Sequence, residues 1–235
     1  MPTADVLLGG DCTGSKTYGL SFIAGYVDTA VFVGLFGLFT AHVTGNFVLI
    51  GSELVHRRPD VWPKLLAFPV FVVAVAAAVK IVETLERRRT AAVPMLLYTE
   101  AALLLLACGA VVLRHPARSS DPTALIAGML AAGAMGIQNA MMRMPLASLP
   151  STTVMTMNVT QSVVDLVTMI SRNVDPATDG ARRQESRTRF ARMWPHIVAF
   201  TVGAASGAAG YAFAGFAALL VPGGLCVALA ARWKT

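Results

Sequence analysis

One acidic residue lies deep inside an apolar stretch near the start of the chain. A carboxylate in a lipid bilayer costs on the order of 3 kcal/mol, so such a group normally faces the protein interior and has a partner there. The residue either binds a proton, a cation or a solute, or it accepts hydrogen bonds from Thr44, Asn46 and the freed backbone of a broken helix. It is Asp28, and its apolar neighbours include Ile23, Ala24, Val27, Ala30 and Val31.

The polar pattern around Asp28 recurs in the second half of the chain. Gly25-Tyr-Val-Asp28 resembles Gly136-Ile-Gln-Asn139, and further on Thr44-Gly-Asn46 resembles Thr156-Met-Asn158. Asn139 retains hydrogen-bonding capacity at the place of Asp28 but carries no charge. A single ionisable position is typical of an asymmetric task, and Met157 replaces the glycine at Gly45. The first copy is therefore the better candidate for chemistry, and the second is expected mainly to hold the architecture.

Both copies are expected to contribute to one binding site for a solute or an ion. Threonine and asparagine at a helix start either cap the helix or coordinate a solute, and capping is the commoner use. Glu53 and Asp165 lie two turns beyond the Thr-x-Asn elements, where they extend a polar track or mark the helix end. The primary candidates are Asp28, Thr44, Asn46, Gln138, Asn139, Thr156 and Asn158, and the secondary ones are Glu53, Glu100, Asp165 and Arg143.

The elements that must position these residues are transmembrane helices. Hydrophobic residues make up 55% of the chain and charged residues 14%, and the mean hydropathy is +0.63. A spanning helix needs about 20 apolar residues. Helices are predicted at 62–82, 92–113, 122–142, 194–212 and 214–231, with a first helix from about 18 to 34, a short one from about 43 and a polar one at 151–170.

The recurring motifs predict an internal duplication. Trp62-Pro63 matches Trp194-Pro195 after the other two pairs, and in both the proline is expected in the first helical turn. The repeats are predicted at 18–113 and 122–231, joined by a linker at 114–121. Residues 1–17 and 232–235 form an N-terminal segment and a C-terminal tail, and the second repeat contains a basic cytoplasmic loop at 172–193.

The fold class is therefore an all-α polytopic membrane protein with two possible topologies. In one, each repeat has three spans and a short broken or re-entrant helix, which gives six spans and inverted repeats. In the other, each repeat has four spans, which gives eight spans and parallel repeats. The dense cluster Arg87-Arg88-Arg89 prefers the cytoplasm and favours six spans. Both topologies place the two termini in the cytoplasm.

Several classes of function are disfavoured by the sequence. The basic residues lie in short stretches without interleaved aromatic residues, which indicates cytoplasmic loops and no nucleic-acid partner. Three cysteines and four histidines are scattered, so no metal site, disulfide framework, cofactor or enzymatic motif is expected. Gly203, Ser206, Gly207 and Gly210 form a small-residue face that is expected to pack the last two helices of the second repeat together.

These paired motifs resemble the YoaK-like family of bacterial multi-pass membrane proteins, which is defined by a domain of unknown function (DUF1275). The resemblance rests on Gly25 to Asn46 and on Gly136 to Thr156, and it extends over about residues 15 to 230. It implies a bacterial inner-membrane protein with about six helices and no established substrate.

The leading hypothesis is a small secondary transporter or permease for an unidentified solute, with its site between the two repeats. The alternative is a membrane scaffold or partner-binding protein whose polar motifs are structural. The expected partners are the lipid bilayer and a small solute, and the sequence leaves a homo-oligomer open.

Overall fold

The computed structural model describes residues 10–56, 61–112, 121–171 and 176–233, and all regular elements in these ranges are helical. The predicted linker at 114–121 falls almost entirely outside them, as do residues 1–9 of the N-terminal segment. The elements are α2 (Gly10–Gly34), α3 (Gly45–Val55), α4 (Val61–Arg87), α5 (Ala92–Val112), α6 (Pro122–Met141), α7 (Met155–Ile170), α8 (Pro176–Ala214), the 3-10 helix η1 (Gly215–Leu219) and α9 (Leu220–Arg232).

Four helical stretches in the described residues are long and apolar enough to cross a membrane. They are α4, α5, α6 and the stretch Gly180–Arg232, which includes most of α8 and all of α9. The all-helical membrane class is thereby supported, and the predicted helices at 62–82, 92–113 and 122–142 are confirmed. The N-terminal segment is shorter than predicted, because residues 10–17 already belong to α2.

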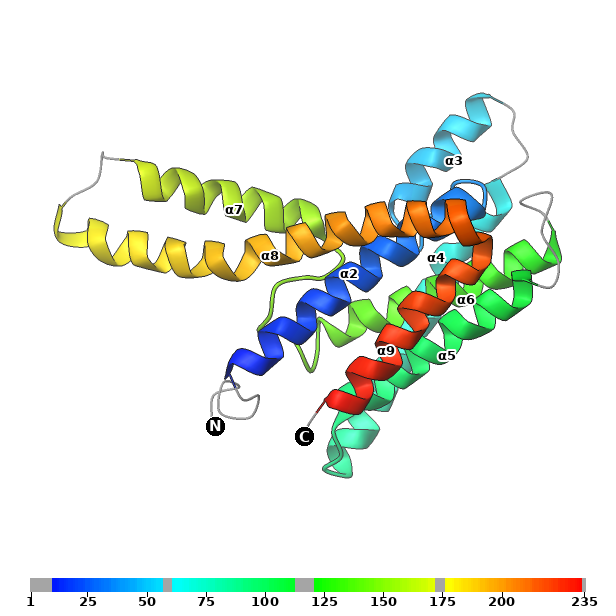
Figure 1. Ribbon diagram of the computed structural model, residues 1–235, viewed down its shortest axis with the longest axis horizontal. Helices are drawn as coiled ribbons and strands as arrows, with labels where there is room; N and C mark the ends of the chain where they lie inside the picture. Colours follow the sequence, from blue (N-terminus) through cyan, green and yellow to red (C-terminus); the bar gives the residue numbers. More distant parts are fainter. Residues whose placement is uncertain (1–9, 57–60, 113–120, 172–175, 234–235) are drawn as a thin grey trace.

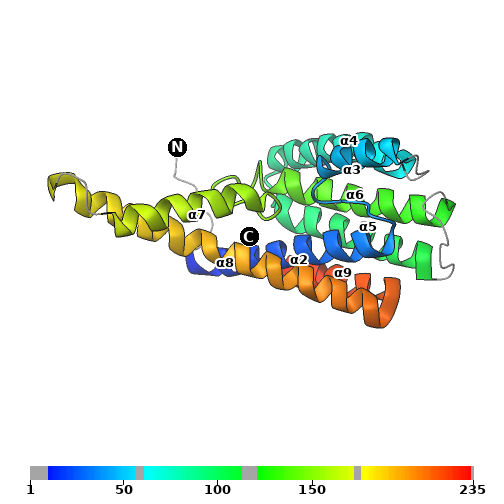
Figure 2. The ribbon, with the colours of Figure 1, turned by 90° about the horizontal axis from the view of Figure 1, so that it is seen from above.

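The long helices run side by side as a bundle, and both termini lie at one end of it (Figure 1). The turn between α4 and α5, which follows Arg87, lies at this same end. The two short helices leave the bundle and diverge from each other. In Figure 1 α3 extends towards the end away from the termini, whereas α7 runs out to the left, beside the first part of α8, as it also does in Figure 2.

Helices from the two halves of the chain pack against each other at glycines. α2 packs along α8, and α4 packs along α6. A Cβ atom on Gly25 would lie 2.2 Å from the carbonyl oxygen of Phe200, and one on Gly203 would lie 2.1 Å from that of Phe22. Gly136 meets Phe71 in the same manner at 3.0 Å. The first glycine of each sequence signature therefore allows the backbones of two helices to approach closely.

This packing corrects one prediction. The small residues of α8 were expected to pack against the next helix of the second half, but Gly203 and Gly207 lie against the backbone of Phe22 and Tyr26 in α2. The sequence pattern indicates a close helix contact but does not identify the partner helix. A face of small residues can accept the backbone of any helix that approaches it closely.

The predicted basic loop at 172–193 is also wrong where the structure describes it. Residues 176–193 form the first part of the continuous helix α8, and Pro195 lies inside that helix instead of in its first turn. This region is rich in good helix formers, and Arg189 bonds Glu185 one turn earlier and Asp165 of α7. Docking on α7 thus stabilises a helix where charge density suggested a loop.

A groove on the bundle surface lies between α4 and α5. These two helices have little contact with each other, and α6 forms the floor between them. The groove has a volume of about 590 Å³, and its walls are apolar apart from Thr99. Such a surface suits lipid acyl chains.

Candidate functional site

Asp28 organises the non-helical segment that follows α2. After Gly34 the chain turns through Phe36 and Gly37, both with positive φ, and returns alongside α2. The Oδ1 atom of Asp28 then accepts hydrogen bonds from the backbone nitrogens of Thr40 at 2.7 Å and Ala41 at 2.8 Å, and from the Thr40 hydroxyl at 3.2 Å. The carboxylate thus satisfies backbone groups that the helix break leaves free.

The second oxygen of Asp28 contacts a histidine. Its Oδ2 atom lies 2.7 Å from Nδ1 of His42. The Asp28 side chain is only 6% exposed, whereas that of His42 is 39% exposed. The carboxylate therefore orients an imidazole whose other side remains accessible, an arrangement that can take up and release a proton.

His42 was missed as a site residue when the histidines were considered scattered. A comparison of the two halves of the sequence could have identified His42 as a partner of Asp28. Asp28 is replaced by Asn139 in the second copy, and His42 is replaced there by Val154. Both members of the ionisable pair are therefore replaced by uncharged residues at the matching positions of the second half.

In the second half of the chain, uncharged side chains hold the junction between α6 and α7, as Asp28 holds the junction between α2 and α3. Asn139 accepts a hydrogen bond from the Thr153 hydroxyl at 2.7 Å and donates one to the carbonyl of Met135. Gln138 is buried and donates to the Thr152 hydroxyl and to the carbonyl of Leu20 in α2, both at 2.9 Å. Gln138 therefore ties the second junction to the first helix.

The two asparagines of the Thr-x-Asn elements make equivalent bonds. The Asn46 amide donates to the carbonyl of Phe39 at 2.8 Å and accepts from its backbone nitrogen at 3.0 Å. The Asn158 amide donates to the carbonyl of Ser151 at 2.7 Å. Each asparagine lies seven residues beyond its partner and fixes the start of a short helix to the chain that precedes it.

The threonines of these elements do not behave as predicted. Thr44 and Thr156 are both exposed. Thr44 is the N-cap residue of α3 but makes no side-chain capping bond, and the N-cap residue of α7 is Val154. The capping interpretation is wrong for both, because the neighbouring asparagines bond the preceding chain instead.

The two junctions meet inside the molecule. The backbone of Thr153 lies close to the imidazole of His42, and the ring of Phe200 in α8 lies edge-on to that imidazole with centroids 5.6 Å apart. From this region α3 and α7 start and diverge (Figure 1). The primary residues Asp28, Asn139 and Gln138 therefore belong to one polar region, to which His42, Thr152 and Thr153 are added.

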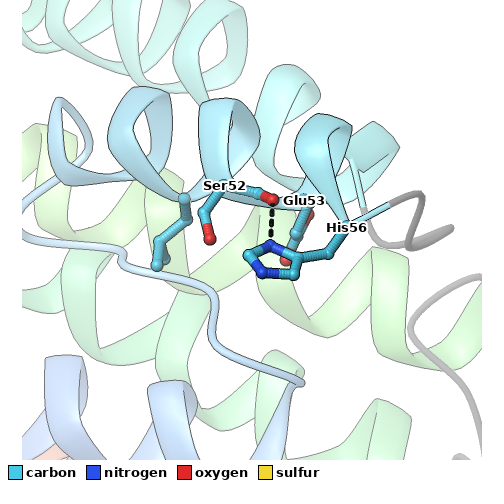
Figure 3. Close-up of a pocket in the computed structure, with 4 residues that line it drawn as sticks. Ser52, Glu53 and His56 are labelled. Atoms are coloured by element: carbon cyan, nitrogen blue, oxygen red, sulfur yellow. Dashed lines mark hydrogen bonds between the residues drawn. The ribbon is translucent and has the colours of Figure 1, made fainter.

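Glu53 belongs to a second polar cluster, on the side of α3 that faces α4. Its Oε1 atom lies 2.8 Å from Nζ of Lys64, which is buried and also donates to the carbonyl of Phe36 at 3.0 Å. Above this pair, Ser52, Glu53 and His56 line a pocket of about 190 Å³ together with Leu49 (Figure 3). Glu53 thus joins α3 to α4 through an ion pair and lines a surface pocket.

Asp165 plays the corresponding part in the other short helix. Its side chain is fully buried, and Arg189 of α8 binds it through Nε and Nη2, the latter at 2.7 Å. Asn158, Ser162 and Asp165 of α7 are buried, whereas Val163, Val164 and Val167 are exposed. Both short helices are therefore joined by an ion pair to the following long helix and turn apolar side chains outward.

The remaining secondary candidates lie apart from this region. Glu100 is buried in α5, where it interacts with Cys226 of α9. Arg143 follows the end of α6 and is exposed. Among the described residues, no three histidine, cysteine, aspartate or glutamate side chains lie together in an arrangement that could hold a metal ion.

Comparison with known proteins identifies the family. Residues 17–232 match the family described as protein of unknown function (DUF1275). Because the match covers most of the chain, the protein belongs to this family. Neither the curated proteins nor the solved structures contain a match.

Proposed function

We propose that the protein is a small secondary transporter or permease, built from two repeats, whose site lies where the two helix junctions meet. The observation that carries the proposal is the Asp28–His42 pair, a partly accessible ionisable group held against the second junction at Thr153. In transporters with discontinuous helices, sites of this kind lie between repeats near the middle of the membrane.

The duplication is supported by equivalent bonds in the two halves. Asn46 bonds Phe39 as Asn158 bonds Ser151, and α2 packs on α8 as α6 packs on α4.

Helix length favours six spans. α3 has 11 residues and α7 has 16, which correspond to about 17 and 24 Å at 1.5 Å per residue. Neither crosses a core of about 30 Å. With α3 and α7 as half-helices, the spans are α2, α4, α5, α6, the second part of α8, and η1 together with α9, which follow each other without a break. The Arg87–Arg89 turn and both termini then lie on the cytoplasmic side of the bacterial inner membrane.

Transport should be tested on purified protein in liposomes, with currents recorded on a solid-supported membrane. A panel of amino acids, sugars, carboxylates and nucleosides would be applied under an inward proton gradient. We expect a current with one solute class in the wild type and its loss in His42→Gln. His56→Gln, which changes an exposed histidine of α3 that bonds only its own helix at Ser52, is the matched control. No response of the wild type to any solute class would contradict transport. An unchanged response of His42→Gln would show that His42 takes no part in the transport mechanism.

One observation favours the alternative, a membrane scaffold with structural polar motifs. Asp28 already accepts three hydrogen bonds within its own junction. A scaffold requires the Asp28 carboxylate as a hydrogen-bond acceptor but does not require the imidazole of His42. If His42→Gln and the wild type bind the same protein partners and neither responds to any solute, the scaffold explanation gains.

A further inference from the structure

Glu100 is an acidic residue that the proposed transport site does not use. It lies in α5 with its side chain fully buried. Neither of its carboxyl oxygens has a hydrogen-bond partner of ordinary geometry among the described residues. The group that interacts with it is the Cys226 thiol of α9, a weak donor. Glu100 thus differs from Asp28, Glu53 and Asp165, which all have strong partners.

The helices packed around Glu100 supply no counter-charge. α6 contains no titratable residue, and η1 contains none either. α9 offers Cys226 and, in its last turn, Arg232. On α4, which has little contact with α5, Lys80 is exposed and bonds Glu83. On α5 itself the other titratable side chains are Tyr98, which is exposed, and Cys108, which donates to the carbonyl of Phe216.

A buried and unpaired carboxylate is far less stable than the neutral acid, and the bilayer increases the difference. We propose that Glu100 is a proton-binding site in the seam between α5 and α9, separate from the Asp28–His42 pair, that holds its proton at neutral pH. The seam is tight, since a Cβ atom on Gly223 of α9 would lie 2.9 Å from the side chain of Leu105. Loss of the proton therefore requires α5 and α9 to separate and admit water. The assignment does not depend on solute transport.

Dicyclohexylcarbodiimide tests the protonation state directly, because it reacts with neutral carboxylic acids in apolar surroundings. The acid proton moves to a carbodiimide nitrogen while the carboxyl oxygen bonds the central carbon. Acyl transfer to nitrogen then gives a stable N-acylurea without a leaving group. The Cys226→Ala background prevents the neighbouring thiol from intercepting the first adduct. Glu53 is the matched control, since it is also largely buried but forms an ion pair with Lys64.

We expect one adduct by intact mass, mapped to the peptide that contains Glu100, no adduct on Glu53, and none on that peptide in Glu100→Gln. Infrared spectra of wild type and Glu100→Gln at about pH 7 give a second readout that needs no reagent. The carbonyl stretch of a protonated acid should be present in the wild type and lost in the variant. Absence of this band from the wild type, or labelling of Glu53 in place of Glu100, would overturn the proposal.

Discussion

The imidazole of His42 lies 2.7 Å from the carboxylate of Asp28, fourteen residues earlier in the chain. The contact exists because the segment after α2 reverses and runs back along the helix it has left. One oxygen of Asp28 binds the backbone of this segment, and the other orients His42. Asp28 is thus both a structural acceptor and a positioning group, and the two interpretations of its role describe different oxygens of one side chain.

Replacement of Asp28 by asparagine should destabilise the protein. Hydrogen bonds to a charged group contribute about 1.5 to 3 kcal/mol, and the asparagine amide can serve only part of the present donors. We expect the free energy of unfolding to fall by about 2 kcal/mol, measured by titration with a denaturing detergent. Thr44→Val, in the same junction but exposed, should change it by less than about 0.5 kcal/mol. Equal effects of the two changes would contradict the assignment of Asp28.

The α2–α8 contact predicts a strong position dependence for alanine at glycine sites. Gly25→Ala forces a methyl group to within 2.2 Å of the Phe200 carbonyl oxygen, so the helices must separate. Overpacking costs about 1 to 3 kcal/mol or more. Gly109→Ala, in α5, has no atom within 4 Å of the new Cβ and should be neutral or stabilising by up to about 1 kcal/mol. Thermal melting in detergent compares the two, and a lower melting temperature for Gly109→Ala than for Gly25→Ala would contradict this packing.

The buried Glu53–Lys64 pair should give strongly non-additive substitutions. Glu53→Leu alone removes a carboxylate that lies 2.8 Å from a buried ammonium, and we expect a loss of about 3 to 5 kcal/mol. The double variant Glu53→Leu/Lys64→Met removes both charges and should lose much less than the sum of the single variants. A double-mutant cycle on unfolding free energies measures the coupling. Additive effects would mean that the two side chains do not interact.

The stabilisation of α7 by Asp165 should depend on pH. Burial raises the pKa of this carboxyl, but the bonds from Arg189 and Gln161 and the charge of Arg189 outweigh it and hold the pKa below its usual value of 3.8. Because the pKa is lower in the folded state, the stabilisation is fully present above the unfolded value of about 3.9 and is lost as pH falls through the folded value.

Melting temperatures of wild type and Asp165→Asn should therefore differ at about pH 7, and the difference should shrink as pH falls below about 4 and through the lower pKa of the folded protein. Glu83→Gln is a suitable control, because Glu83 is exposed and forms only a surface pair with Lys80. A difference between wild type and Asp165→Asn that persists unchanged in strong acid would contradict the charged interaction with Arg189.

Much of the helical framework could be predicted from the sequence because the bilayer imposes long apolar segments. The ends of α5 and α6 and the break before α3 follow from hydropathy, glycine and polar residues. The start of α8 could not be predicted in this way, since its first part is stabilised by the contact of Arg189 with Asp165 on another helix.

The site was only partly predictable for a related reason. Asp28, Asn139 and the two asparagines stand out as polar residues in apolar surroundings. The partners of Asp28 and Glu53, however, are set by how the chain folds back, which brings His42 and Lys64 to them. Hydropathy does not encode these non-local pairs, and the threonines were overvalued because residue type alone suggested capping.

The proposed six-span arrangement requires that α3 enters the membrane without crossing it. In a variant with its three native cysteines replaced by alanine, single cysteines at Arg88 and at His56 would be labelled with a membrane-impermeant maleimide in intact cells and in inverted vesicles. Six spans predict that Arg88→Cys reacts only in inverted vesicles and that His56→Cys reacts in intact cells. The reverse pattern, with position 56 cytoplasmic and position 88 outside, would show that α3 crosses and would contradict the account.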